Sequence, residues 1–209
     1  MKKIRTLQSV ILQLAFIALI SFSIVSCDNK AKTEDSNNLA TEDSKEVAED
    51  KNDNTRTKGG MNTEADAEFL VAAAESDQKE VRLGKLAQEK GSMTDVKELG
   101  KMMEMAHTES MTELSAFAKK KLVTLPETQT EMVNEAYTKL SNMKSGKEFD
   151  KEYCDMEVNG HKRTIEKFEV ASTTSADPEI KMMATNMLPN LRKHLEMAEM
   201  CQKKCEAMK

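Results

Sequence analysis

The chain has few of the residues that break helices and few of the aromatic residues that dominate most protein cores. Its 209 residues include no Trp, two Tyr, three Pro and seven Gly. By contrast, Ala, Glu, Lys, Leu and Met are plentiful, and all of them favour helices. The composition therefore predicts an all-α protein whose core rests on aliphatic side chains and methionine.

Several motifs that would name a reaction are missing as well. The sequence has no Gly-x-Ser-x-Gly, no phosphate-binding loop, no dinucleotide fingerprint and no paired Cys-x-x-Cys. Hydrolase, nucleotide-binding and thioredoxin-type functions therefore lack support. Its 31 basic and 36 acidic residues are interspersed and leave no basic stripe, so we do not expect nucleic acid as a partner.

The amino terminus carries the clearest signal. Lys2, Lys3 and Arg5 precede an apolar stretch from 10 to 25, and Ile24-Val25-Ser26-Cys27 follows at its end. This pattern resembles the signal peptide of bacterial lipoproteins, and it implies cleavage after residue 26 and acylation of Cys27. Several acyl chains hold a protein on a membrane far better than one does. An ordinary signal peptide or a short anchor helix is the alternative.

Residues 27–62 follow as a predicted tether. They contain no aromatic residue and few branched aliphatic ones among many Asp, Glu, Lys, Asn, Ser and Thr. Such a segment buries too little apolar surface to offset the entropy of ordering it. We predict a disordered acidic spacer, and a folded domain over residues 63–209.

Apolar residues recur at spacings of three and four from residue 63 onward, as in amphipathic helices. The predicted helices cover residues 63–90, 93–121, 127–142, 147–171 and a last stretch from 178. Ser92 with Asp95 predicts the cap of the second helix, and Asp177-Pro178 predicts the start of the last one. Pro189 should kink that last helix. Four long helices and a short one in the crossing connection predict an up-and-down four-helix bundle.

Landmarks along these helices resemble a bacterial envelope family of unknown function often labelled "predicted outer membrane protein". That family is assigned to the ferritin-like bundles, so the resemblance implies a ferritin-like fold and an envelope location, more than an activity. The landmarks are Phe69, Glu80-Val81-x-Leu83-Gly84-x-Leu86-Ala87, Val96, Met103, His107, Leu125-Pro126, Phe149-Asp150-x-x-Tyr153, Gly160-His161, Leu188-Pro189 and His194-Leu195.

All three histidines and several glutamates fall on or beside the inward helix faces. Ferritin-like di-iron sites use two Glu-x-x-His pairs and two further glutamates. Only Glu104-x-x-His107 fits here, because Val158 and Leu191 stand three residues before the other two histidines. Two interpretations are therefore left open: a buried polar network, or an Fe, Mn or Zn site at the bundle centre. The candidate residues are Glu80, Glu104, His107, Glu157, His161 and His194.

A second group of candidates is rich in sulfur. Thiolates and thioethers favour Cu(I), although methionine at helical spacing is also common in cores. With Cys27 acylated, three cysteines remain, and an odd number leaves at least one thiol free or bound to a partner. The candidate soft-metal residues near the carboxyl terminus are Met197, Met200, Cys201, Cys205 and Met208.

Three functional classes follow from the sequence. The first is a non-enzymatic, lipid-anchored helical domain that supports envelope integrity or stress tolerance through protein or ligand contacts. The second is a metal-binding envelope protein, and the third is a degenerate ferritin-like redox enzyme. We expect the outer membrane as the location, with the domain facing the periplasm or the surface, and no cofactor is assured.

Overall fold

The computed structural model describes residues 43–57 and 63–207, and all regular structure within these ranges is helical. The all-α prediction is therefore confirmed. The predicted signal peptide, Cys27 and Met208 lie outside the described residues. The helices are α1 (Asp43–Thr57), α2 (Glu64–Lys90), α3 (Thr94–Lys120), α4 (Glu131–Ser141), α5 (Lys147–Thr174) and α6 (Pro178–Ala207).

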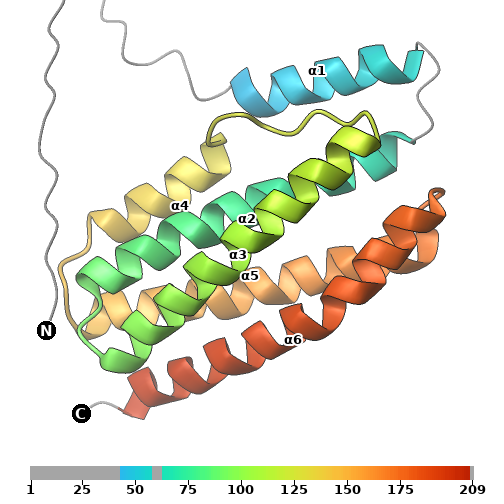
Figure 1. The fold of residues 1–209 in the computed structure, drawn as a ribbon. Coiled ribbons are helices and arrows are strands. Elements are labelled where there is room, and N and C mark those ends of the chain that lie inside the picture. Colours follow the sequence, from blue (N-terminus) through green and yellow to red (C-terminus); the bar gives the residue numbers. More distant parts are fainter. Residues whose placement is uncertain (1–42, 58–62, 208–209) are drawn as a thin grey trace, which may run out of the picture. The chain divides into compact units, whose positions relative to one another are not determined.

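Four long helices, α2, α3, α5 and α6, form a bundle, and α4 packs on the side of α2 (Figure 1). Ion pairs fix the direction of α6 against α3, because Asp95 pairs with Lys204 and Lys120 with Glu179. Helix α6 therefore runs antiparallel to α3. It also runs antiparallel to α5, so α3 and α5 point the same way. The connection over residues 121–146 contains the short helix α4, as predicted, and it returns along the bundle before α5 begins, so that α3 and α5 are parallel and the four long helices do not simply alternate in direction.

The ends of α2 and α6 follow from local capping. Thr63 accepts a hydrogen bond from the Asp66 amide at 3.2 Å, and the Asp66 carboxylate accepts one from the Thr63 amide in return. This capping box starts α2 one residue after its predicted first residue. At α6, the Asp177 carboxylate accepts from the Glu179 amide at 2.8 Å, and Pro178 is the first helical residue. The helix continues through Pro189.

Helix α3 starts in a way that the local sequence did not indicate. Its N-cap is Met93, without a side-chain cap of its own. Asp150, from α5, accepts hydrogen bonds from the amides of Ser92 and Met93, both at 2.9 Å. The predicted local cap by Ser92 and Asp95 was therefore wrong, because a buried carboxylate from another helix satisfies these donors.

Part of the predicted tether is helical. Helix α1 lies within residues 27–62 and buries Ala48 and Asn52. The Asn52 amide side chain accepts from the Thr124 amide at 2.7 Å and donates to the Thr124 carbonyl at 3.1 Å. Hydrogen bonds to the 121–130 segment, the burial of Ala48 and an ion pair between Lys45 and Glu75 of α2 therefore hold α1. Residues of this segment, Thr124 and Thr128 among them, bond to α1, and α4 starts after it at Glu131 instead of Glu127.

The bundle interior has three layers along its length. One end holds an apolar cluster from the amino-terminal halves of α2 and α6 and the carboxyl-terminal halves of α3 and α5, including Leu70, Leu114, Phe168 and Ile180. The opposite end holds a second cluster that includes three cysteines. Charged and imidazole side chains lie between the two clusters: Asp77, Lys79, Glu80, His107, Glu157 and His161 are buried, and His194 is half-buried.

Close approach of α2 and α3 depends on two glycines. A Cβ atom on Gly84 would lie 2.5 Å from the Gly100 carbonyl oxygen, and one on Gly100 would lie 2.7 Å from the Gly84 carbonyl oxygen. Any side chain at either position would push the backbones apart. This contact brings α2 near enough to α3 for the Asp77 carboxylate on α2 to reach the His107 imidazole on α3.

Candidate metal centre

Three imidazoles from three helices meet in the middle layer. His107 comes from α3, His161 from α5 and His194 from α6, and their ring centroids lie 5.3 to 5.6 Å apart. One ring nitrogen of each lies within 4.8 Å of those of the other two. Residues 107, 161 and 194 are all the histidines of the chain. The fold therefore gathers every imidazole at one point.

Each ring presents one buried nitrogen that has no hydrogen-bond partner among the described residues. These atoms are Nε2 of His107, Nε2 of His161 and Nδ1 of His194. An unpaired buried polar atom costs about 1–3 kcal/mol of stability. Three such atoms close together are more readily explained by a shared ligand than by packing alone.

The opposite nitrogens of two rings are held by neighbours. His107 Nδ1 donates to the Asp77 carboxylate at 2.7 Å, and Asp77 also accepts from the Ser110 hydroxyl at 2.8 Å. His161 Nδ1 lies 2.9 Å from the Glu157 carbonyl oxygen, which can only accept, so this nitrogen carries the proton. Both rings thereby direct the Nε2 lone pair inward. Carboxylate and carbonyl partners of this kind orient metal-binding histidines.

Two buried glutamates adjoin the imidazoles. Ligand atoms of Glu80, Glu157 and His161 lie within 4.8 Å of one another. Lys79 Nζ lies 2.9 Å from Glu80 Oε1, which leaves Oε2 without a partner among the described residues. Gly160 on α5 makes room for this pair, because a Cβ there would lie 2.8 Å from Lys79 Nζ. His161 thus belongs to both the imidazole group and the carboxylate group.

The two glutamates differ in acidity. Burial alone would raise the pKa of Glu80, but the charges of Lys79 and of the nearby imidazoles hold it below its usual range. Burial and the charge of Glu80 raise the pKa of Glu157 well above its usual value. The two shifts are opposite, so Glu80 is the more acidic of the pair and its carboxylate is the one more readily available to a cation.

Two of the imidazoles have a lowered pKa. Burial lowers the pKa of His161, and burial followed by its two histidine neighbours lowers the pKa of His194 to about 4. Metal ligation requires the neutral ring. Both rings therefore hold the ligand form across the physiological range.

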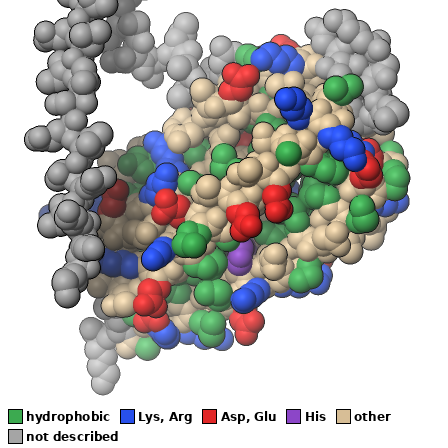
Figure 2. All heavy atoms as spheres, in the orientation of Figure 1, with side chains coloured by type: hydrophobic (Ala, Val, Ile, Leu, Met, Phe, Trp, Pro, Cys, Tyr) green, Lys and Arg blue, Asp and Glu red, His purple; other side chains and the backbone are tan. Residues whose placement is uncertain are grey.

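The three imidazoles differ in exposure. His107 and His161 are buried, whereas His194 is only half-buried. Figure 2 shows histidine atoms at the surface, on the face where α3 and α6 lie. An ion could therefore enter past His194, without unfolding of the bundle.

The structure brings together most of the sequence candidates, with one exception. Glu80, His107, Glu157, His161 and His194 converge. Glu104 lies apart: its carboxylate accepts from Gln88 Nε2 at 2.7 Å and lies 3.8 Å from Lys85 Nζ. The Glu-x-x-His motif on α3 therefore contributes only its histidine to this centre. The prediction that Glu104 joins the centre was wrong, because its carboxylate contacts Gln88 and Lys85 instead.

Asp77 and Lys79 were not among the expected residues, and Tyr153 was expected as a landmark but not as a site candidate. Asp77 stands three residues before Glu80, on the inward side of α2, so helical spacing alone could have indicated it. Tyr153 is buried one turn before Glu157, and its hydroxyl has no partner within the described ranges. Burial and the nearby carboxylates raise the pKa of Tyr153 well above its usual value, so the phenol stays protonated.

The sulfur candidates do not gather as predicted. Cys201 and Cys205 are buried together with Cys154, which the predicted set left out. Met200 is 50% exposed, and Met197 is a partly buried neighbour of the second cluster. The group at this end is therefore made of thiols.

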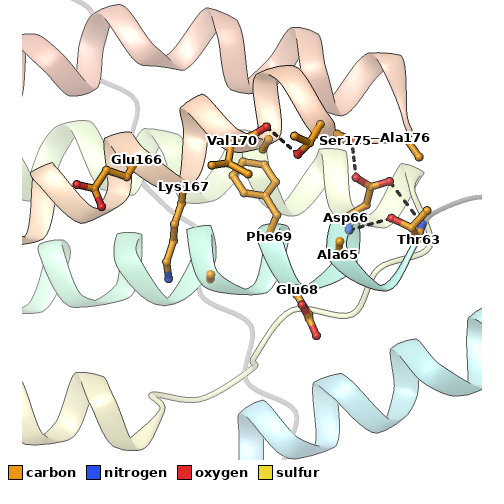
Figure 3. A pocket seen from close by; sticks show the side chains of 13 residues that line it. Thr63, Ala65, Asp66, Glu68, Phe69, Glu166, Lys167, Val170, Ser175 and Ala176 are labelled. Carbon is orange, nitrogen blue, oxygen red and sulfur yellow. Dashed lines mark hydrogen bonds between the residues drawn. The ribbon is translucent and has the colours of Figure 1, made fainter.

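A groove of about 560 Å³ lies away from the imidazoles, between the start of α2 and the end of α5 (Figure 3). Phe69 and Val170 line it, and Thr63, Asp66 and Ser175 lie at one end. Those polar groups are engaged with one another in capping, since Ser175 donates to Asp66. The groove therefore offers no convergent chemistry of its own.

None of the helices in the described ranges has both the length and the apolar character needed to cross a membrane.

A family model described as "Domain of unknown function (DUF4142)" matches residues 51–201, which include nearly all of the bundle and every imidazole. The chain belongs to this family. Comparison of this chain with curated proteins and with solved structures found no match. The DUF4142 match begins within α1, so that helix is partly inside the domain. The name carries no activity, and the site must be interpreted from its geometry.

Proposed function

We propose that this DUF4142 domain binds a divalent first-row metal ion of the Fe, Mn or Zn group through His107, His161 and His194. The observation that carries the proposal is the convergence of three buried ring nitrogens that lack hydrogen-bond partners in the described part of the chain. Imidazole suits these metals, and a neighbouring carboxylate favours the harder members. Glu80 Oε2 is the natural fourth ligand.

A purely structural polar network explains the layer less well. Such a network would pair its members, and here Asp77 and the Glu157 carbonyl pair only the outer nitrogens. The inner nitrogens and Glu80 Oε2 remain unpaired. A cation bound by the three ring nitrogens would satisfy those atoms, and its charge would offset that of Glu80, which adjoins His161 and which the interior otherwise disfavours.

The number of ligands favours one strongly bound ion. Di-iron bundles need two histidines, each with its own glutamate, and two further bridging glutamates. Here Glu104 faces elsewhere, the pKa of Glu157 is raised by burial and by the charge of Glu80, and Lys79 pairs with one oxygen of Glu80. These features support metal holding rather than di-iron redox chemistry, and we infer a non-enzymatic role.

We further propose that the fold is ferritin-like and that the domain is anchored in the bacterial envelope, at the outer membrane, by an acylated Cys27. The long return between parallel α3 and α5 supports the first point, because ferritin-like bundles have one such crossover. The lipoprotein-like sequence at residues 1–27 supports the second. Metal holding would then serve stress tolerance in that compartment.

Metal content tests the proposal. The full chain, purified without chelator and dialysed against Zn²⁺, Mn²⁺ or Fe²⁺, should retain about one ion, and its thermal stability should rise with the logarithm of the free ion concentration. His107→Ala and Glu80→Ala should lower retention, whereas Glu104→Ala, the matched carboxylate outside the cluster, should not. A parent chain that retains no ion, together with a His107→Ala variant destabilised by about 1–3 kcal/mol, would point to the polar network instead.

A further inference from the structure

Three thiols lie together at the other end of the bundle. Cys154 comes from α5, and Cys201 and Cys205 come from successive turns of α6. All three are free and buried. The Cys154 sulfur lies 3.0 Å from that of Cys201 and 3.7 Å from that of Cys205, and the three sulfurs lie within 4.8 Å of one another.

This thiol cluster is separate from the imidazole centre. Cys154 precedes His161 by seven residues on α5, and Cys201 follows His194 by seven on α6. Because α5 and α6 are antiparallel, both steps lead toward the same end of the bundle. Seven helical residues rise about 10 Å, which is too far for one ion to bind both groups.

A thioether completes the set. Met93, at the start of α3, places its sulfur 3.6 Å from that of Cys205. Zinc in proteins is bound by thiolate, imidazole and carboxylate groups, whereas thioether sulfur is a ligand for copper(I). The surrounding side chains are apolar, among them Leu86, Val96 and Phe149. A buried group whose closest donors to one another are sulfur atoms suits a soft monovalent ion better than a hard divalent one.

Hydrogen bonds link the three thiols, and a bound ion would replace the protons in those bonds. Hydrogen bonding from Cys154 lowers the pKa of Cys201, while burial raises the pKa of Cys205 to about 11. Ion binding would break S–H bonds, release those protons to solvent and form metal–sulfur bonds, with no change of oxidation state.

We propose that Cys154, Cys201 and Cys205, assisted by Met93, form a second metal site that binds one copper(I) ion. The proposal is independent of the imidazole centre, since it uses none of its residues. It also gives a role to three thiols whose positions small apolar side chains could otherwise fill.

Competition with a coloured copper(I) chelator tests the site. The full chain, kept anaerobic with a non-thiol reductant, should take one copper(I) from the chelator. Cys154→Ser and Cys201→Ser should each abolish that uptake. Met93→Leu should weaken it roughly 10-fold, and Met102→Leu, a partly buried methionine of the same cluster, should leave it unchanged.

Two controls separate this site from others in the chain. Cys27→Ser removes the cysteine outside the cluster, and His161→Ala disables the imidazole centre; both variants should keep the sulfur-bound ion. X-ray absorption of the copper-loaded parent should show a sulfur-only shell, and this readout does not depend on whether a cysteine variant folds. A nitrogen shell, uptake lost with Cys27→Ser, or preferential sulfur binding of Zn²⁺ over copper(I) would overturn the proposal. So would a Cys154–Cys201 disulfide that persists under the reductant.

Discussion

The apolar end and the middle layer of the bundle are equally buried but differ in energetic effect. Leu70 and Glu157 are both 0% exposed. Leu70 belongs to a cluster of aliphatic and aromatic side chains, where burial itself stabilises the fold. Glu157 belongs to a layer where carboxyl and imidazole atoms lack partners in the described part of the chain. The first region accounts for stability, and the second lowers it unless a ligand is bound.

This difference indicates where function resides. An interior that served stability alone would extend the aliphatic cluster through the middle, since well-packed apolar residues often replace buried ions without loss. Instead the helices carry Asp77, Lys79, Glu80 and their imidazole neighbours there. The layer departs from the pattern of both ends, and such departures are expected at functional sites.

The largest effect should come from the apolar end. Leu70→Ala leaves a cavity among tightly packed neighbours and should lower the free energy of unfolding by about 2–5 kcal/mol. Metal retention per folded chain should not change. Urea denaturation and metal analysis check the two parts. Val170→Ala, at a position 60% exposed, should shift stability by less than about 0.5 kcal/mol. A loss of metal in folded Leu70→Ala would contradict the separation between a stabilising apolar layer and a metal-binding middle layer.

An intermediate effect is expected at Asp77. Asp77→Asn keeps the size of the side chain but weakens the acceptor of the His107 Nδ1 proton. Metal affinity should fall by roughly 10–100-fold, as for other groups that orient metal-binding histidines. Isothermal titration with Zn²⁺ measures the change. Glu109→Gln, on the exposed side of α3, is the control. Unchanged affinity in Asp77→Asn would remove the orienting role of this carboxylate.

The smallest effect concerns acidity. The pKa of His194 is about 4 in the folded chain, below the ordinary value of 6.5, because burial disfavours its charged form. Between these two values the unfolded chain binds the extra proton, so stability falls as the pH falls from 6.5 to 4. His194→Gln cannot titrate. Relative to this variant, the metal-free parent should therefore lose stability over that window.

Urea unfolding of both chains at several pH values in this range makes the comparison. The effect should be modest, since His194 is half-buried and water screens its charge. Parallel pH profiles for the two chains would show that the His194 ring is not held in its neutral form.

Much of the fold could be predicted because its signals are local. The capping groups at Thr63 and Asp177 lie within three residues of the helix starts they determine. Asp150, in contrast, caps α3 from 57 and 58 residues away, and Asn52 holds the 121–130 segment across 72 residues. Those contacts depend on how the helices pack, which the spacing of apolar residues does not specify.

The same limit applies to the two sites. His107, His161 and His194 fall on inward faces, so their helices alone indicated that they meet. Glu104 was included because it precedes His107 by three residues, but its side chain turns toward Gln88 on α2. Cys154 was left out because it lies 47 residues from Cys201, and only the register of α5 against α6 brings their sulfurs together.

Anomalous diffraction from crystals of the Zn²⁺-loaded chain, recorded at the zinc absorption edge, tests the central claim most directly. The account predicts one peak in the middle layer, about 2.0–2.1 Å from Nε2 of His107, Nε2 of His161 and Nδ1 of His194. A fourth contact should come from Glu80. Crystals with zinc only at the surface, or with the three imidazoles bonded to one another or to water, would contradict it.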